Sequence, residues 1–376
     1  PQLFVWDYVT NFSSYIVPHP NMRVLASNVR YFTENRVIGL FEQGDSQSNV
    51  GDFIRMRAWL LAHLMWDPAC DEKQLIREYL DGYYGAAAPF LMKYLDVIHD
   101  AGERTGVYLR CFMNDTSSYL SLDDLNQASR LFAQAEAAVA DEPELARRVR
   151  RERLPLDHVW LRRYHSLRLA AQTGPQDFLG PADPVKACDE FIRVANEFKV
   201  GNYRERYAFR EYAESLRDRF RPPGPPPVAC RELPAEKWID FQDNQFRLAE
   251  RGNWAEVIDD KLASDGKAVR MPGEHREWAT SLPLSNDLAS RNPWRCYVVA
   301  RAEATASEGT TMTMGIYDSK NRKSVTHRTV TAKETASGEY QTFDLGSFAV
   351  TGDMYIWIAP PQRPDQVQAV LVDRIY

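Results

Sequence analysis

Two acidic residues, Asp7 and Glu42, stand at the ends of two apolar runs near the beginning of the chain. The runs, residues 3–9 and 37–41, have the length and composition of β-strands, and residues 21–35 between them have helical spacing. In α/β barrels the C-terminal ends of the strands carry the chemistry. Hydrolysis of a glycosidic bond needs two carboxyl groups, or one carboxylic acid assisted by the substrate's own amide. We therefore take Glu42 and Asp7 as candidate catalytic residues, with Glu42 as the first choice.

The residues around these two acids are aromatic or carry amide and carboxylate oxygens. Aromatic faces stack on sugar rings and amides bind hydroxyl groups, so this mixture favours a carbohydrate cleft. The candidate substrate-binding residues are Trp6, Tyr8, Asn11, Tyr15, Gln43 and Asp45.

A purely structural interpretation of the same residues stays open. Either acid could cap a helix or pair with Arg30 or Arg36. His19 lies in a Pro-His-Pro turn, where a residue at the rim of a cleft is as plausible as a catalytic one. Asp52 is better explained as the N-cap of a helix that begins at residue 53.

Composition indicates a globular chain with ample material for a core, because 44% of its 376 residues are hydrophobic and 26% are charged. No apolar run approaches the roughly 18 residues that span a bilayer. The net charge of −6 and the lack of a basic stripe exclude nucleic acid as an expected partner. The arginine-rich run at residues 147–151 has acidic neighbours and is interpreted as a solvated helix face. The five cysteines match neither a disulfide framework nor a zinc motif.

The chain changes character twice along its length. Helical spacing dominates after residue 51, and the last helix is expected over residues 203–219. A run of five prolines in residues 222–227 then interrupts the chain and is expected to form a stiff linker. Short runs of alternating polarity follow, which is typical of a β-sandwich. We predict an α+β multidomain chain: the C-terminal end of a TIM-barrel (β/α) domain (1–66), a helical bundle (67–220), a linker (221–229) and an all-β jelly-roll sandwich (230–376).

Residues 3–8, 28–32, 37–44, 60–68 and 83–85 together resemble the DUF4838 family of bacterial proteins. That family is similar to α-glucuronidases and hexosaminidases, and its members are assigned as endo-β-N-acetylglucosaminidases of glycoside hydrolase family 163. The resemblance implies a TIM-barrel glycosidase in which Glu42 is a catalytic or substrate-contacting acid. It also implies that the partner acid is Asp7 or lies in a missing N-terminal part of the same polypeptide.

The C-terminal part is similar to carbohydrate-binding jelly rolls in residues 241–246, 263–272 and 372–376. In such modules, acidic residues of the first and last strands often hold a structural calcium ion, and Asp243 and Asp373 are the candidate ligands. Tryptophans could form a sugar platform or belong to the core; they are Trp254, Trp278, Trp294 and Trp357.

Three functional interpretations follow from these patterns. The first is an extracellular or periplasmic glycoside hydrolase that acts on glycans containing N-acetylglucosamine and uses no cofactor for catalysis. The second is a non-catalytic carbohydrate-binding protein. The third is an α-glucuronidase-like hydrolase of plant polysaccharide, in which Arg23, Arg30 or Arg36 would pair with the uronate.

Overall fold

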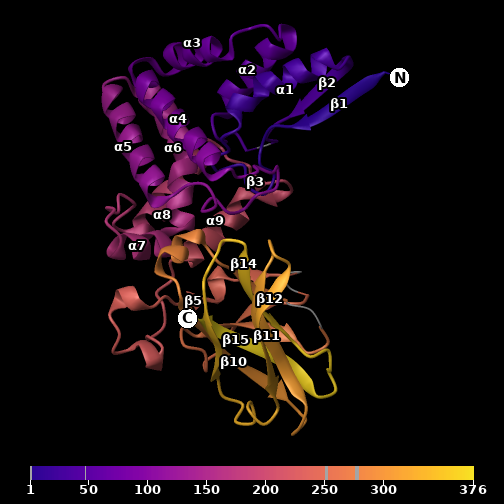
Figure 1. Cartoon of the computed structure of the whole chain (residues 1–376). Helices are drawn as coiled ribbons and strands as arrows, with labels where there is room; N and C mark the ends of the chain where they lie inside the picture. Colours follow the sequence, from indigo (N-terminus) through magenta and orange to yellow (C-terminus); the bar gives the residue numbers. More distant parts are fainter. Residues whose placement is uncertain (1, 47, 250–252, 276–278) are drawn as a thin grey trace. The chain divides into compact units, whose positions relative to one another are not determined.

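A computed structural model describes residues 2–46, 48–249, 253–275 and 279–376. The chain divides into two compact units, residues 1–217 and 218–376 (Figure 1). Within the described residues, the first unit holds all of the long helices and the second is built from antiparallel sheets. This composition confirms the α+β class and the β-sandwich.

The first unit begins with two parallel strands joined by a helix. Strand β1 (Leu3–Tyr8) pairs with β2 (Val37–Gln43), and α1 (Met22–Glu34) connects them. One apolar side of α1, which includes Leu25 and Val29, faces the core of the unit. The predicted order of strand, helix and strand is therefore confirmed, whereas its assignment to the C-terminal end of a TIM barrel stays a prediction.

Helices form the rest of the first unit, and their boundaries follow local sequence signals. Asp71 accepts hydrogen bonds from Lys73 and Gln74 at the start of α3, and Ser121 and Asp124 form a reciprocal capping box at the start of α5. The helices after β2 are α2 (Ile54–Trp66), α3 (Glu72–Tyr84), α4 (Ala88–Thr105), α5 (Leu122–Ala138), α6 (Pro143–Arg162), α7 (Tyr164–Thr173), α8 (Pro184–Glu197) and α9 (Phe209–Asp218). Among the described residues, no helix is both long and apolar enough to cross a membrane.

Two sequence expectations for these helices differ from the structure. The helix expected from residue 203 begins only at Phe209, because a small hairpin of β3 (Asn202–Arg204) and β4 (Tyr207–Ala208) precedes it. Its turn contains Arg206 with a left-handed φ of 58°. The other difference concerns Asp52: the N-cap of α2 is Phe53, whose φ is 51°, and it lacks a side-chain cap.

Two antiparallel sheets make up the second unit. One has the order β13-β10-β15-β8-β7, with β5 also paired to β15, and the other has the order β12-β11-β14-β9-β6. The strands are β5 (Phe241–Gln242), β6 (Arg247–Leu248), β7 (Glu256–Asp259), β8 (Lys267–Pro272), β9 (Thr280–Pro283), β10 (Trp294–Ala304), β11 (Thr310–Asp318), β12 (Lys323–Thr331), β13 (Gln341–Phe348), β14 (Met354–Ala359) and β15 (Val367–Ile375). The strands alternate buried and partly exposed residues, as in Met312, Met314 and Ile316 of β11, and so enclose an apolar core of the jelly-roll type.

The proline-rich segment packs on the second unit instead of spanning free solvent. Pro225 accepts a hydrogen bond of 2.9 Å from the Arg374 guanidinium. A Cβ atom on Gly224 would lie 2.5 Å from the Ser264 carbonyl oxygen, so only glycine permits this close approach.

Candidate functional site

The two candidate acids lie side by side in the structure. Asp7 of β1 and Glu42 of β2 are partners in the parallel register, so their side chains leave the same face of the two-stranded sheet. Adjacent strands are spaced by about 4.8 Å. Position along the sequence alone therefore located a pair of neighbouring carboxyl groups correctly.

Glu42 is partly buried at the end of β2. Among the described residues, neither Asp7 nor Glu42 forms an ion pair, and Glu42 Oε2 is buried without a hydrogen-bond partner. Asp7 accepts the Tyr8 backbone N–H at 2.8 Å. Burial, and secondarily the charge of Asp7, raises the pKa of Glu42 from 4.5 to about 7. A carboxyl group with that pKa is protonated over part of the neutral range, as a general acid must be.

The aromatic residues of the two strands occupy the opposite face. Trp6 packs edge-on against Phe41 with ring centroids 4.9 Å apart, and its indole N–H donates to Gln43 Oε1 at 2.7 Å. Trp6 is 64% exposed. Because side chains alternate across a strand, Trp6, Tyr8 and Gln43 do not share a face with the acids. A ligand could contact both groups only across the tips of the strands, and substrate binding by these residues stays a prediction.

The loop that follows β1 uses its polar side chains internally. Asn11 is buried: its Nδ2 donates to the Met113 carbonyl at 2.6 Å and its Oδ1 accepts the backbone N–H of Ser13 and of Met113. Tyr15 is also buried, with its hydroxyl 3.4 Å from Ser46 Oγ. These contacts hold the loop in place, and they use both lone pairs of Asn11 Oδ1 and one of the two N–H groups of its Nδ2.

Asp45 is enclosed by hydroxyl groups near the end of β2. Its carboxylate accepts from Thr10 Oγ1 and from Ser48 Oγ, the latter at 3.0 Å. Burial raises its pKa, although the two hydroxyl groups oppose that rise. The geometry assigns Asp45 a part in ordering the loop.

Asp52 and His19 form a buried network with Arg57. Asp52 Oδ2 accepts the His19 backbone N–H at 2.9 Å and lies 3.6 Å from the Arg57 guanidinium, which also donates to the His19 carbonyl. Burial lowers the pKa of His19 to about 3 and raises that of Asp52 to about 6. Asp52 thus joins the turn around His19 to α2, which is why it does not cap that helix.

Two of the three arginines considered for a uronate are already engaged. Arg23 pairs with Asp96, Asp100 and Glu103 at 2.7–3.0 Å. Arg30 pairs with Glu72 and donates to two backbone carbonyls. Neither guanidinium faces Glu42 as an ion-pair partner, so the alternative in which Arg30 neutralises that acid is not observed.

The two aspartates proposed as calcium ligands already have protein partners. Asp243 pairs with Arg221 at 2.6 Å, and Asp373 accepts the Ser264 N–H and hydroxyl and lies 3.4 Å from Arg374. No group of three or more histidine, cysteine or acidic residues that could hold a metal ion is found in the described part of the chain. Asp243 uses only Oδ1 for that pair, and its Oδ2 is buried without a hydrogen-bond partner among the described residues, so the calcium site stays a prediction.

One face of the second sheet gathers aromatic side chains that sequence reasoning only partly found. Trp357 of β14 lies opposite Gly315 of β11 in the register, and a Cβ on Gly315 would approach the indole ring to 3.1 Å. His327 lies 5.7 Å from the Trp357 ring, and Tyr317 and Tyr355 are 5.6 Å apart on the same face. The alternation of Tyr317, Tyr355 and Trp357 with buried core residues is the signal that could have identified these three.

The other tryptophans considered for a platform lie elsewhere. Trp254 stacks on His275 with centroids 4.4 Å apart, and the Trp294 indole donates to the Leu288 carbonyl at 2.8 Å. Trp278 lies outside the described residues.

Comparison with known proteins finds a family match in the first unit and likenesses to solved structures at low scores. Residues 1–96 match the model of a family described as "Domain of unknown function (DUF4838)". No curated protein matches this chain.

The similar solved structures include the CBM22-1 xylan-binding domain from Paenibacillus barcinonensis Xyn10C, with 10% identity, a TM-score of 0.27, and coverage of 36% of this chain and 91% of that one. A Clostridium thermocellum endo-1,4-β-D-xylanase with CBM22-1 and GH10 modules is 12% identical, with a TM-score of 0.25 and coverage of 36% and 26%. TmCBM61 in complex with β-1,4-galactotriose is 12% identical, with a TM-score of 0.24 and coverage of 37% and 97%.

Proposed function

We propose that the β1–β2 edge carries the general acid of a glycoside hydrolase that acts on glycans containing N-acetylglucosamine. The observation that carries this proposal is Glu42: a partly buried carboxyl group beside Asp7, with no cation among the described residues paired to it, whose pKa is raised to about 7. The DUF4838 match over residues 1–96 supports it through the family resemblance noted from the sequence. The substrate class rests on that resemblance, and the acid chemistry rests on the geometry.

In this mechanism protonated Glu42 donates its proton to the glycosidic oxygen as the bond to the anomeric carbon breaks. Asp7 or the substrate's acetamide stabilises the oxocarbenium-like centre, and water then completes hydrolysis. We propose that further barrel strands of the same polypeptide form the walls of the cleft.

The test is the Glu42→Gln variant of the natural polypeptide that contains this chain. It should lose at least about a hundredfold in turnover of a complex N-glycopeptide, measured by mass spectrometry of the released glycan, because general acids contribute about 10²–10⁴-fold. Glu34→Gln is the matched control, since Glu34 is exposed in the same βαβ unit and should keep full activity. Near-normal turnover by Glu42→Gln would remove Glu42 from the mechanism.

A second candidate function is glycan binding by the aromatic face of the sandwich. Trp357, Tyr355 and Tyr317 are partly exposed on one sheet face, and His327 is exposed beside them. Aromatic rings placed on a flat sheet suit stacking against sugar rings. In calorimetric titrations with xylo-, galacto- and chito-oligosaccharides, Trp357→Ala should abolish the heat of binding, whereas Trp294→Ala should retain it. No heat with any of these glycans would count against this function.

A further inference from the structure

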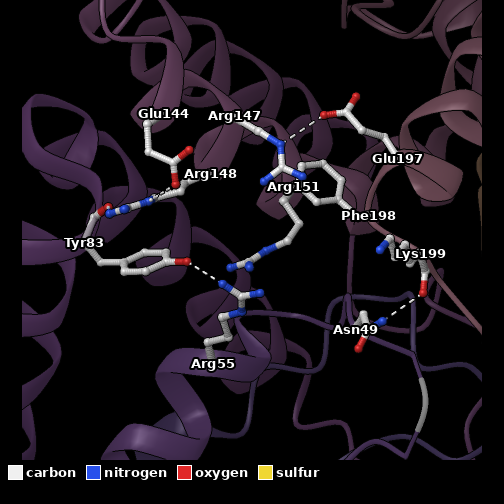
Figure 2. A pocket seen from close by; sticks show the side chains of 10 residues that line it. All are labelled: Asn49, Arg55, Tyr83, Glu144, Arg147, Arg148, Arg151, Glu197, Phe198 and Lys199. Atoms are coloured by element: carbon white, nitrogen blue, oxygen red, sulfur yellow. Dashed lines mark hydrogen bonds and ion pairs between the residues drawn. The ribbon is translucent and has the colours of Figure 1, made fainter.

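An arginine-rich pocket in the first unit is not used by either proposed function. Its volume is about 270 Å³, and it lies where α2, the end of α3, α6 and the end of α8 meet (Figure 2). The residues that line it are Asn49, Arg55, Tyr83, Glu144, Arg147, Arg148, Arg151, Glu197, Phe198 and Lys199. The sequence interpretation of residues 147–151 as a solvated face holds for Arg147 and Arg150, which are 49% and 40% exposed, but not for Arg151, which is only 4% exposed.

Three guanidinium groups of this pocket surround one tyrosine. Arg55 Nη1 donates to the Tyr83 hydroxyl at 2.7 Å, and the guanidinium carbons of Arg148 and Arg151 lie 4.3 Å and 5.9 Å from the centre of its ring. Figure 2 shows the ends of Arg55 and Arg151 pointing toward one another beside Tyr83. Like charges at this proximity repel, so the arrangement favours an anion that they can share.

The carboxylates at hand do not balance these cations. Arg148 pairs with Glu144 and Arg147 with Glu197, each at 3.2 Å, and buried Arg151 is neutralised by Glu152 behind it. Among the residues that the structure describes, Arg55 and Lys199 have no ion-pair partner. The pocket therefore carries an excess of positive charge.

The backbone places Lys199 at an unusual position. Lys199 follows the C-cap of α8 with a φ of 56°, and the bonds from its N–H to the Asn196 carbonyl and from the Val200 N–H to the Ala195 carbonyl form a Schellman motif. Glycine is the favoured residue there. Asn49 is also left-handed, with a φ of 60°, and its Nδ2 donates to the Lys199 carbonyl at 2.8 Å. Lys199 thus lines the same pocket as Arg55, and neither has an ion-pair partner among the described residues, so its charge adds to that of the arginine.

We propose that this pocket binds a small oxyanion: a sulfate, a phosphate or a carboxylate, free or as a substituent of a saccharide. Guanidinium groups match such anions through pairs of parallel N–H donors, and two nitrogens of Arg147 and two of Arg55 have no hydrogen-bond partner among the described residues. The volume suits one charged group with a sugar-sized body at most. This site is separate from Glu42 and holds whether or not that residue is catalytic.

The experiment is calorimetric titration of the full chain with sodium sulfate, inorganic phosphate and D-glucuronate at constant ionic strength, with D-glucose as the uncharged comparison. At least one anion should bind saturably with one-to-one stoichiometry, and glucose should not. Preference for sulfate or phosphate over glucuronate would identify a tetrahedral oxyanion, and the reverse a carboxylate.

Variants locate the binding. Arg55→Gln and Lys199→Gly should each weaken it about tenfold or more, because each removes a charge-assisted contact. Lys199→Gly should also keep or raise the melting temperature, since glycine accepts the left-handed φ, so a loss of affinity there is not a folding defect. Arg210→Gln is the control, because Arg210 is 91% exposed on α9 outside the pocket. Absence of saturable binding by all three anions, or unchanged affinity in Lys199→Gly, would overturn the proposal.

Discussion

Buried carboxyl groups of the second unit have arginine partners, whereas the buried carboxyl group of the β1–β2 sheet has none among the described residues. Burial raises the pKa of Asp240 and of Asp243 to about 6, but Arg374 and Arg221 lie against them and oppose that rise. Glu42 experiences the same kind of burial with a second acid beside it instead of an arginine. Burial alone therefore does not mark a chemical site, and the missing cation is the informative difference.

The largest effect is expected where the compensating arginine is removed. Arg374→Leu leaves Asp240 and Asp373 buried without their cation and also removes the bond to the Pro225 carbonyl. Breaking a buried pair costs about 3–5 kcal/mol in the free energy of unfolding. Hydrogen exchange of β15 peptides, measured by mass spectrometry, should show a matching loss of protection. Adding Asp240→Asn to that variant should recover part of the loss; no recovery would mean that the arginine acts through packing alone.

A smaller, pH-dependent effect is expected at Glu42. The pKa of Glu42 is higher in the folded than in the unfolded state, so the folded protein loses stability as pH rises from about 4.5 to 7, and the loss is constant above that window. Because the side chain is only partly buried, we expect the free energy of unfolding of Glu42→Gln to exceed that of the wild type by about 1–2 kcal/mol at pH 8. At pH 4 the two proteins should be equally stable. Urea denaturation at the two pH values measures this difference. An equal difference at both would contradict an elevated pKa.

Replacing Asp7 should separate the two causes of the raised pKa of Glu42, which are burial and the charge of Asp7. In Asp7→Asn the pKa of Glu42 should fall, yet stay above 4.5, because burial is the larger cause of its rise. Carboxyl-selective NMR titration of Glu42 follows this directly. A return of the pKa to 4.5 would assign the whole effect to Asp7, and no change would show that the two groups do not interact.

The smallest effect is expected at an exposed pair. Arg210 lies 3.6 Å from Glu214 one helical turn away, with both side chains mostly in solvent. Arg210→Ala should change the free energy of unfolding by no more than about 0.5 kcal/mol, because solvent screens such pairs. Denaturation in parallel with Arg374→Leu provides the measurement, and comparable losses in the two would undermine the distinction between buried and exposed cations.

Local patterns predicted the elements well, because each depends on neighbouring residues. The cap at Asp71, the box at Ser121 and the alternation in β11 can all be recognised within a short window. The pairing of Asp7 with Glu42 was accessible because parallel strands of a βαβ unit meet at one edge. The hairpin before α9 was missed because the aromatic residues there, Tyr203 and Tyr207, recur at helical spacing.

The roles of loop residues and the anion pocket could not be predicted in the same way. The side chain of Asn11 is hydrogen-bonded to the backbone of Met113, about a hundred positions away, and no periodicity in the sequence predicts such a contact. Arg55, Arg148 and Lys199 come from three separate helical segments that meet only in the folded chain. From the sequence, residues 147–151 were interpreted as a solvated helix face, and only the tertiary structure brings Arg55 and Lys199 beside them.

The β1–β2 sheet also bears on how this protein behaves during handling. Each of its two strands has one neighbour in the described chain, and Phe4, Trp6 and Phe41 are exposed on it. Strand edges with unpaired backbone groups and apolar side chains are templates for adhesion between molecules. Where no further strand covers these edges, we expect this sheet to attract other molecules in concentrated solution, and light scattering that grows with protein concentration measures that attraction.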